Sequence, residues 1–277
     1  MKKNENIMGN LSIETTITAV SGNKGRIKPS ALAAVDKTAF LQALDLRLTE
    51  IGVGLTFEQK QKLADYYELL VGTNRVMNLT GIVEAAEVAE KHIADSLRLL
   101  KYLKTEKETP VKTIIDVGTG AGLPGIPLAV AHPDFRVILL DSQKKRCGFL
   151  EKACAELKLS NTQVVWGRAE ELGHKAEYRE KADFAVARAV APLPVLLEYL
   201  TAFVNPGGKI LAMKGSNIAR EQELARGALR ELNASVAEVA EYELTSGEKR
   251  SLVVIKKTNL LKQKYPRNSG LIKKKPL

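Results

Sequence analysis

A run of glycines between positions 116 and 125 is the part of the sequence best suited to hold a ligand. It reads Asp116-Val-Gly-Thr-Gly-Ala-Gly-Leu-Pro-Gly125 and follows a short β-rich run. Glycines at 118, 120 and 122 allow a tight turn and let a ligand approach the backbone closely. The next β-rich run ends in Asp141, nineteen residues beyond Gly122, where a carboxylate can accept hydrogen bonds from ribose hydroxyls. Together the two features predict a site for a nucleotide-containing cofactor, although either alone would be weak support.

The glycine spacing fits two classes of cofactor. Gly120, Gly122 and Gly125 match the G-x-G-x-x-G pattern of dinucleotide-binding proteins, so an NAD(P)-dependent oxidoreductase is one alternative. The run also matches G-x-G-x-G from position 118, preceded by a carboxylate that disfavours pyrophosphate and suits a cationic ligand such as S-adenosylmethionine. The downstream sequence has no evident acid–base pair for hydride chemistry. We therefore expect S-adenosylmethionine as the cofactor, held by Asp116, Gly118, Gly120, Gly122 and Asp141.

The positive charge of the chain is concentrated at one end. The net charge is +10, and the last 29 residues contain ten basic side chains and no acidic one. The other 248 residues hold 32 basic and 32 acidic side chains, so the protein is not coated for nonspecific binding of nucleic acid. A local basic edge instead predicts an RNA contact, or a noncatalytic RNA-binding module as a further alternative. The residues expected to contact RNA here are Lys249, Arg250, Lys256, Lys257 and Arg267.

A second basic group opens a predicted helix after Asp141. Lys144, Lys145 and Arg146 occupy its first turn, where the helix dipole favours acidic residues. A solvated charge run is the common explanation for three such residues. A nearby RNA backbone would also account for them, and we include all three among the candidate RNA contacts.

Before Pro110 the pattern is helical. Residues 1–38 are polar and lack sustained periodicity, which predicts disorder. Residues 39–109 are expected to form a helical segment that packs on the core. Within it, Thr56 and Gln59 form a capping box at a helix start, and Gly72 to Asn74 is expected to end that helix.

After Pro110, β-rich runs alternate with helical runs. This predicts a doubly wound α/β fold with a mostly parallel, seven-stranded sheet over residues 110–257. Residues 258–277 form a basic tail that is expected to lack a core of its own and to be flexible. The predicted strands are 113–117, 136–141, 163–166, 183–186, 209–213, 235–243 and 251–256.

Composition limits the remaining possibilities. The sequence shows no clustering of His, Cys and Asp at metal-ligand spacing, so we expect no metal site. No run approaches a membrane span, and the N-terminus has no apolar signal region. Cys147 and Cys154 are predicted to be buried, reduced residues. These features favour a cytoplasmic protein without membrane contact, which we expect to be monomeric.

Several motifs, in order, resemble one bacterial family. The cofactor loop Asp116 to Pro127 is similar to that of the small-subunit ribosomal RNA guanine-N7 methyltransferases, formerly called glucose-inhibited division protein B. The resemblance covers residues 40–277. It implies a class I, Rossmann-like methyltransferase with an N-terminal helical extension, using S-adenosylmethionine to methylate N7 of a guanine in 16S ribosomal RNA or a small-subunit precursor. The further matching segments are Asn78-Leu-Thr-Gly-Ile82, His92-Ile-Ala-Asp-Ser-Leu97, Leu140-Asp-Ser-Gln-Lys-Lys-Arg146, Arg168-Ala-Glu170, Ala187-Arg-Ala-Val-Ala191 and Lys214-Gly215.

The resemblance also assigns roles to single residues. It places the cofactor against Gly118 and Leu123, with Ala169 and Glu170 at the adenine. Arg188 follows the fourth predicted strand and is expected beside the cofactor crevice, facing its carboxylate or the RNA. Lys214 ends the fifth strand and is a candidate to hold an RNA phosphate or the target base. His92 is expected to line the target pocket, together with Asp95 and Ser96. Arg188, Lys214 and His92 are thus the candidate catalytic residues.

The chemistry of guanine N7 agrees with the choice of Arg188, Lys214 and His92 as candidate catalytic residues. N7 of guanine carries a free lone pair and can attack a sulfonium methyl group without first losing a proton. No general base is required, and catalysis can come from alignment and electrostatics. After the fourth strand the chain reads Ala187-Arg-Ala-Val, and not the Asn-Pro-Pro-aromatic segment of the methylases that modify exocyclic amines.

Overall fold

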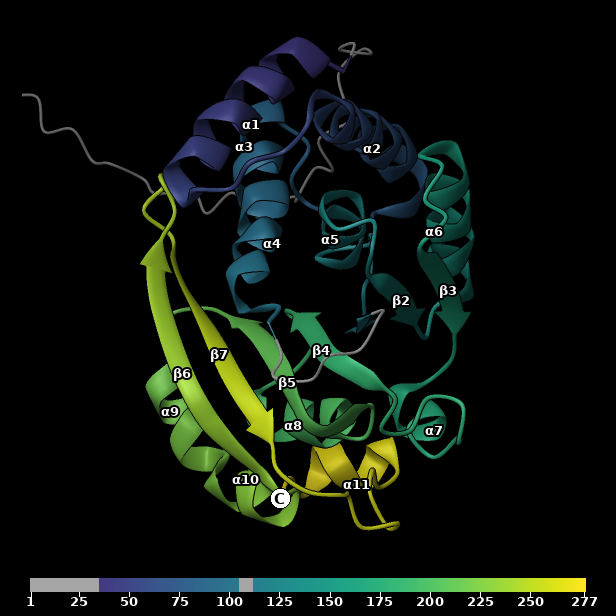
Figure 1. Cartoon of the computed structure of the whole chain (residues 1–277), viewed down its shortest axis with the longest axis vertical. Helices are drawn as coiled ribbons and strands as arrows, with labels where there is room; N and C mark the ends of the chain where they lie inside the picture. Colours follow the sequence, from purple (N-terminus) through teal and green to yellow (C-terminus); the bar gives the residue numbers. More distant parts are fainter. Residues whose placement is uncertain (1–34, 105–111) are drawn as a thin grey trace, which may run out of the picture. The chain divides into compact units, whose positions relative to one another are not determined.

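The computed structural model describes residues 35–104 and 112–277. Its first two helices are α1 (Lys37–Ile51) and α2 (Phe57–Met77) (Figure 1). The predicted capping box is confirmed, because Thr56 accepts from the Gln59 amide and the Gln59 side chain accepts from the Thr56 amide. The predicted stop at Gly72 to Asn74 is wrong. The helix continues to Asn78, whose left-handed backbone (φ 49°) closes it. The prediction for residues 1–38 falls mainly outside the described residues.

The part of the predicted helical segment that follows Asn78 is irregular. It comprises α3 (Ala85–Val88), a π-helical turn (Ala89–Ala94), α4 (Asp95–Leu97) and a 3-10 turn (Arg98–Tyr102). A π-turn takes up one extra residue within a helix and is frequent at functional sites. The turn here immediately precedes Asp95.

The predicted doubly wound sheet is confirmed. Its strand order is β3-β2-β1-β4-β5-β7-β6, and only β7 runs antiparallel to its neighbours β5 and β6. The helix before the last two strands is broken in two at Ala225. The strands are β1 (Thr113–Val117), β2 (Arg136–Asp141), β3 (Thr162–Trp166), β4 (Ala182–Arg188), β5 (Val204–Lys214), β6 (Ala234–Glu243) and β7 (Lys249–Lys257). The connecting helices are α5 (Gly125–Ala131), α6 (Lys144–Glu156), α7 (Ala169–Leu172), α8 (Leu193–Thr201), α9 (Ile218–Leu224), α10 (Arg226–Glu231) and α11 (Ser269–Lys274).

Alternate residues of the central strands enter cores on opposite faces of the sheet. Ile114 and Phe184 pack with α5, α6 and the helices that precede the sheet. Ile115 and Ala185 pack with α8 and α10 on the other face (Figure 1). Phe40 of α1 belongs to the first core, so the helices before the sheet share apolar packing with it. This burial on both faces is what the apolar strands of a doubly wound fold require.

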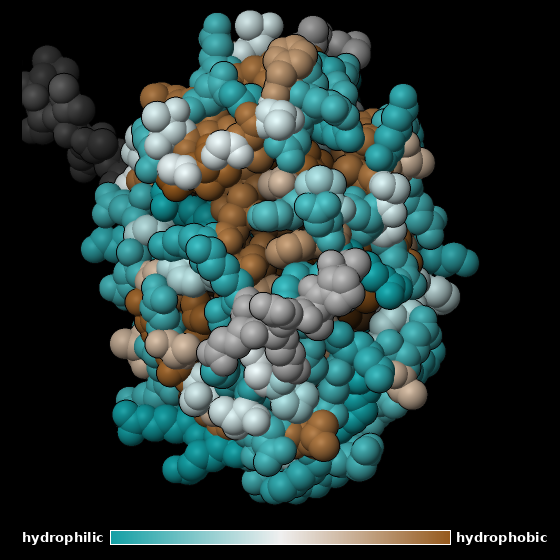
Figure 2. All heavy atoms as spheres, viewed as in Figure 1, coloured by the Kyte–Doolittle hydropathy of each residue, from teal (hydrophilic) through white to brown (hydrophobic). Residues whose placement is uncertain are grey.

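Apolar residues also line a groove between α1, the 3-10 turn and β6. The groove has a volume of about 370 Å³, and Tyr242 forms part of its wall. In the view of Figure 2, hydrophobic residues are most visible beside α1 and α4, while much of the remaining surface on this face is hydrophilic. Among the described residues, no helix is long and apolar enough to cross a membrane.

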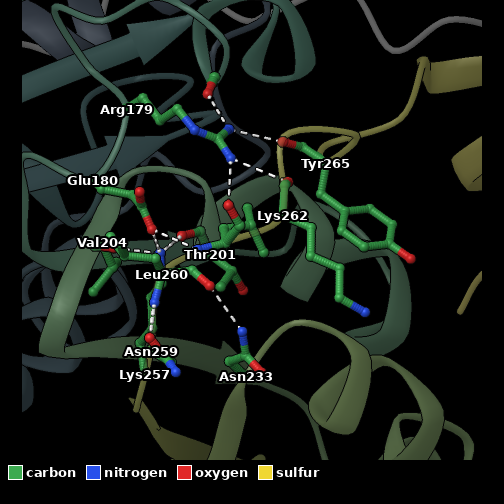
Figure 3. A network of polar contacts seen from close by, with 12 residues as sticks. Arg179, Glu180, Thr201, Val204, Asn233, Lys257, Asn259, Leu260, Lys262 and Tyr265 are labelled. Atoms are coloured by element: carbon green, nitrogen blue, oxygen red, sulfur yellow. Dashed lines mark hydrogen bonds and ion pairs between the residues drawn. The ribbon is translucent and has the colours of Figure 1, made fainter.

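The C-terminal tail is not the flexible segment that its composition predicted. Leu261 and Tyr265 are buried in the core beneath α8, and Ile272 of α11 packs on α8 itself. The Arg179 guanidinium donates to the carbonyls of Leu261, Lys262 and Tyr265 (Figure 3). Apolar anchors and carbonyl contacts therefore fasten the tail, in spite of its charge.

Lys257 joins the tail to the sheet and is completely buried. Its ammonium lies 2.5 Å from a carboxylate oxygen of Glu180 and donates to the carbonyls of Thr201 and Val204 (Figure 3). Burial lowers the pKa of this lysine, although the Glu180 carboxylate opposes that shift. The prediction that Lys257 contacts RNA is therefore wrong, because its ammonium is buried and paired with Glu180.

We expect Lys257→Met to destabilise the chain. Removing one partner of a buried ion pair costs about 3–5 kcal/mol, since the other charge and the carbonyls lose their partner. Urea denaturation measures the loss, and Lys249→Met, at the exposed start of the same strand, is the control that should change little. Equal stabilities of the two variants would contradict a structural role for Lys257.

Candidate functional site

The largest concentration of predicted site residues lines one cleft at the carboxyl ends of β1, β4 and β5. The cleft has a volume of about 600 Å³. In an open α/β sheet, this edge is where ligands bind. The lining residues are Leu79, Thr80, Ile82, Lys91, His92, Asp95, Gly118, Thr119, Gly120, Ala121, Leu123, Arg146, Arg188, Ala189, Met213, Lys214, Gly215, Glu221 and Arg250.

The glycines of the loop differ in the space that surrounds them. Gly118, Gly120 and Gly122 all have positive φ, at 72°, 61° and 99°. A Cβ at Gly118 would lie 2.9 Å from a Val190 methyl group, and one at Gly122 would lie 2.4 Å from Ile126. A Cβ at Gly120 would meet nothing closer than 3.9 Å, because it would project into open space. Gly118 and Gly122 are thus needed for packing, whereas the bare backbone at Gly120 borders the cleft.

Asp116 organises this loop from beneath it. The side chain is completely buried, and one carboxylate oxygen accepts from Thr119 Oγ1 at 2.6 Å and from the Gly125 amide at 2.8 Å. Burial raises the pKa of Asp116 to about 7. The other oxygen is buried without a hydrogen-bond partner among the described residues. Asp116 does not line the cleft, so its predicted contact with the cofactor is corrected to a contact with the loop.

Asp141 fixes the other side of the same loop. Its Oδ2 accepts from the Gly120 amide at 2.9 Å, and its Oδ1 accepts from the Gln143 amide at 2.8 Å. The residue is 2% exposed, and Arg146 lies 3.7 Å from Oδ2. The carboxylate therefore holds the backbone of Gly120 at the cleft. Its predicted role as a ribose acceptor stays a prediction.

Ala169 and Glu170 lie apart from the cleft lining. Both are in α7, and Glu170 borders a different hollow formed by α7 and the tail, which includes Arg168 and Arg267. The Glu170 carboxylate is 3.4 Å from Arg168. The structure does not bring these two residues together with the glycine loop in one cavity, and their predicted contact with adenine remains a prediction.

The candidate catalytic cations are held in place by carbonyl groups. Arg188 Nη1 donates to the Lys91 carbonyl at 2.9 Å and lies 3.6 Å from Asp95 Oδ2. Lys214 Nζ donates to the Ala191 carbonyl at 2.8 Å and lies 2.7 Å from Glu221 Oε2. Both side chains line the cleft, as the sequence analysis expected.

His92 faces the same cleft as an uncharged ring. Its Nε2 is 2.7 Å from Thr80 Oγ1, and the side chain is almost fully buried. Burial, followed by the nearby Arg188 cation, lowers the pKa of His92 to about 4, so the ring is neutral at neutral pH. Ser96 does not share this position. The π-turn changes the helical register, and Ser96 is buried with its hydroxyl bonded to the His92 carbonyl.

Sequence reasoning missed several residues that build the site. Tyr66 of α2 donates from its hydroxyl to the Ala121 carbonyl at 2.7 Å, which supports the glycine loop. Tyr242 of β6 donates to Asp95 Oδ1 at 2.7 Å. Both look like ordinary amphipathic tyrosines in the sequence, so no local signal reveals them. Thr80 and Ile82 had a signal, since they belong to the segment Asn78 to Ile82 that carries the family resemblance.

The candidate RNA contacts divide into accessible and structural residues. Lys144, Lys145 and Lys249 are exposed, while Arg146 and Arg250 line the cleft. Lys256 is partly buried. Arg267 forms two hydrogen bonds from its guanidinium to the carboxylate of Glu198, which is 1% exposed, so this arginine fastens the tail. Only part of the predicted basic edge is thus available to a partner.

Comparisons with known proteins identify close relatives. Residues 59–253 match the family model GidB, described as rRNA small subunit methyltransferase G. The ribosomal RNA small subunit methyltransferase G of Leuconostoc mesenteroides is 43% identical over 232 residues, which cover 83% of this chain and 96% of that protein. The protein of the same name from Leuconostoc citreum is 41% identical over 241 residues, covering 86% of this chain and 98% of that protein. One from a Thermoanaerobacter species is 43% identical over 229 residues, covering 82% and 94%.

The raised pKa of Asp116 predicts a specific dependence of stability on pH. A folded-state pKa of about 7, above the ordinary 3.8, means that the folded chain binds this proton more tightly than the unfolded chain. The resulting stabilisation is complete below about pH 4 and is lost as the pH rises through about 7. Asp116→Asn keeps an oxygen for Thr119 and the Gly125 amide but does not titrate.

We therefore expect the free energy of unfolding of Asp116→Asn, relative to wild type, to increase as the pH rises from about 5 to about 8. The slope should approach about 1.4 kcal/mol per pH unit at its steepest. Urea denaturation at a series of pH values measures this difference. A difference that stays constant across the range would show that Asp116 does not titrate there.

Proposed function

Because this chain belongs to the rRNA small subunit methyltransferase G family, we infer that it places a methyl group on N7 of a guanine in 16S ribosomal RNA. It is an S-adenosylmethionine-dependent methyltransferase of small-subunit ribosomal RNA, with a class I, Rossmann-like fold. The relatives give no support to a nicotinamide-dependent oxidoreductase or to a noncatalytic RNA-binding module. The observation that carries the proposal is a cleft lined both by a bare glycine backbone and by cations that carbonyl groups hold in place.

The glycine loop suits the cofactor. Gly118, Gly120 and Leu123 line the cleft, and the space beside Gly120 is open. Two buried carboxylates fix this stretch of backbone before any ligand arrives, which reduces the ordering cost of binding. S-adenosylmethionine supplies a methyl group carried on a sulfonium, which an unprotonated ring nitrogen can accept.

The remaining cleft residues fit a reaction that needs no general base. His92 is neutral and weakly basic, and Arg188 and Lys214 are cations. Carbonyl contacts hold both cations, and each keeps further N–H donors that can orient a phosphate or the base. Their part in the reaction is to align the target ring and to stabilise charge on it.

The accessible cations extend from the cleft to the surface. Arg146 and Arg250 line the cleft, while Lys144, Lys145 and Lys249 are exposed nearby in sequence. We propose that these residues contact the RNA backbone around the target guanine. We also propose that the chain acts as a monomer in the cytoplasm, on 16S ribosomal RNA or a small-subunit precursor.

The proposal predicts one missing modification. Cells that lack this protein should lose a single 7-methylguanine from 16S ribosomal RNA, and incubation of that RNA with the purified protein and S-adenosylmethionine should restore it. Mass mapping locates the modified nucleotide. An unchanged modification pattern in such cells would overturn the proposed reaction.

A substitution at Gly120 tests the cofactor wall. Gly120→Ala places a methyl group in the open space of the cleft and adds about 1–2 kcal/mol of backbone strain at positive φ. We expect the affinity for S-adenosylmethionine, measured by calorimetry, to fall on the order of tenfold or more. Gly148→Ala in α6 is the control, because its Cβ would meet nothing within 4 Å and lies in an ordinary helix. An unchanged affinity for S-adenosylmethionine in Gly120→Ala would show that the cofactor does not bind against Gly120.

A further inference from the structure

Among the described residues of the cleft, Asp95 is the almost fully buried carboxylate, and one of its oxygens accepts no hydrogen bond. Within the described part of the chain, the carboxylates that line the cleft are those of Asp95 and Glu221. Glu221 Oε2 accepts from Lys214 and from the Leu193 amide, each at 2.7 Å, and this side chain is 27% exposed, so water can reach its other oxygen. Asp95 Oδ1 accepts from Tyr242, but Oδ2 has no hydrogen bond within residues 35–104 and 112–277, and its nearest cation is Arg188 at 3.6 Å. Asp95 lines the cleft, and its Oδ2 keeps acceptor capacity that the fold does not use.

A carboxylate at this place is costly for a site that binds RNA. The residue is 2% exposed, so its charge is largely removed from water. It also reduces the positive potential that Arg188, Lys91 and Arg250 offer to phosphates. An apolar residue would avoid both costs. The carboxylate is explained if the substrate presents hydrogen-bond donors to it.

Guanine presents such donors on the edge opposite its N7. Its N1–H and N2–H₂ groups lie side by side, and a carboxylate can accept from two adjacent donors. Adenine has an acceptor at N1, which a carboxylate repels. We propose that Asp95 recognises the N1–H and N2–H₂ edge of the target guanine and so turns N7 away from itself. The inference rests on the proposed methylation of guanine and adds how that base is selected and oriented.

Tyr242 acts in this recognition as a positioning residue. Its hydroxyl reaches Asp95 from β6, and the Arg98 guanidinium lies 4.5 Å from the centre of its ring. Burial raises the pKa of Tyr242, so its hydroxyl stays a neutral donor. The phenol thereby fixes the rotation of the carboxylate, and the π-turn that precedes Asp95 fixes its place on the helix. Loss of this hydrogen bond would leave the acceptor present but poorly aimed.

The test compares guanine with inosine, which keeps N7 and N1–H but lacks the N2 amino group. The substrates are two 16S ribosomal RNAs assembled with guanine or inosine at the methylated nucleotide. With wild-type protein, we expect kcat/KM to be roughly 10- to 100-fold lower for inosine. Asp95→Asn turns an amide N–H toward the base donors, so it should lose methylation of guanine by a similar factor and no longer distinguish the two RNAs.

Tyr242→Phe keeps the ring and removes only the hydroxyl. We expect Tyr242→Phe to lower the ratio of kcat/KM for the guanine RNA to that for the inosine RNA. Its affinity for S-adenosylmethionine should equal that of the wild type. Tyr102→Phe removes a hydroxyl that donates to Glu238 outside the cleft, and it should keep the full preference. Thermal unfolding of each variant separates loss of recognition from loss of folding.

The possible failures are distinct. If wild-type protein does not methylate the guanine RNA, the proposed function itself fails. If it methylates guanine and inosine equally, or if Asp95→Asn weakens binding of S-adenosylmethionine and keeps the preference for guanine, the recognition by Asp95 is overturned.

Discussion

The buried carboxylate of Asp116 holds the turn around which the whole cleft is arranged. A single oxygen ties Thr119 in the loop to the first amide of α5, so β1, the loop and the helix become one rigid piece. Desolvation of this group is expensive, and its raised pKa reflects that cost. Asp141 and Tyr66 then bind the same loop from β2 and α2. Side chains from β1, β2 and α2 thus converge on one stretch of glycine backbone.

The cations that line the cleft are also fixed before any ligand binds. Arg188 and Lys214 are long side chains that would be mobile in water, yet each is tied to a backbone carbonyl and lies near a carboxylate. Their conformational entropy is therefore lost on folding and not on binding RNA. A site built in this way needs little rearrangement to receive two reactants, which suits a reaction that depends on alignment.

The sequence predicted correctly those features that depend on residues close together in the chain. Alternation of β-rich and helical runs predicted the sheet, and the glycine run predicted where the cleft lies, because both depend on neighbours in the chain. It misled at Asp116, Lys257 and Arg267, whose types suggest surface or ligand roles. Lys257 and Arg267 are paired with carboxylates that the fold brings from distant parts of the chain, and Asp116 is bonded to the loop that follows it. Burial of each charge depends on these pairings. The tail illustrates the point, since three apolar anchors outweigh its net charge.

The geometry of the cleft depends on the number of residues in the π-turn between Ala89 and Ala94. A π-turn takes up its extra residue locally, so deletion of one residue here would restore a regular helix and leave Asp95 near Tyr242. The residues inside the turn would shift by about 100°, and His92 would turn away from Thr80. Apolar packing would survive such a change more easily than the cleft would. In evolutionary terms, this stretch should tolerate many exchanges of residue type and very few changes in residue number. The site therefore requires a fixed number of residues in the π-turn more than it requires particular residue types there.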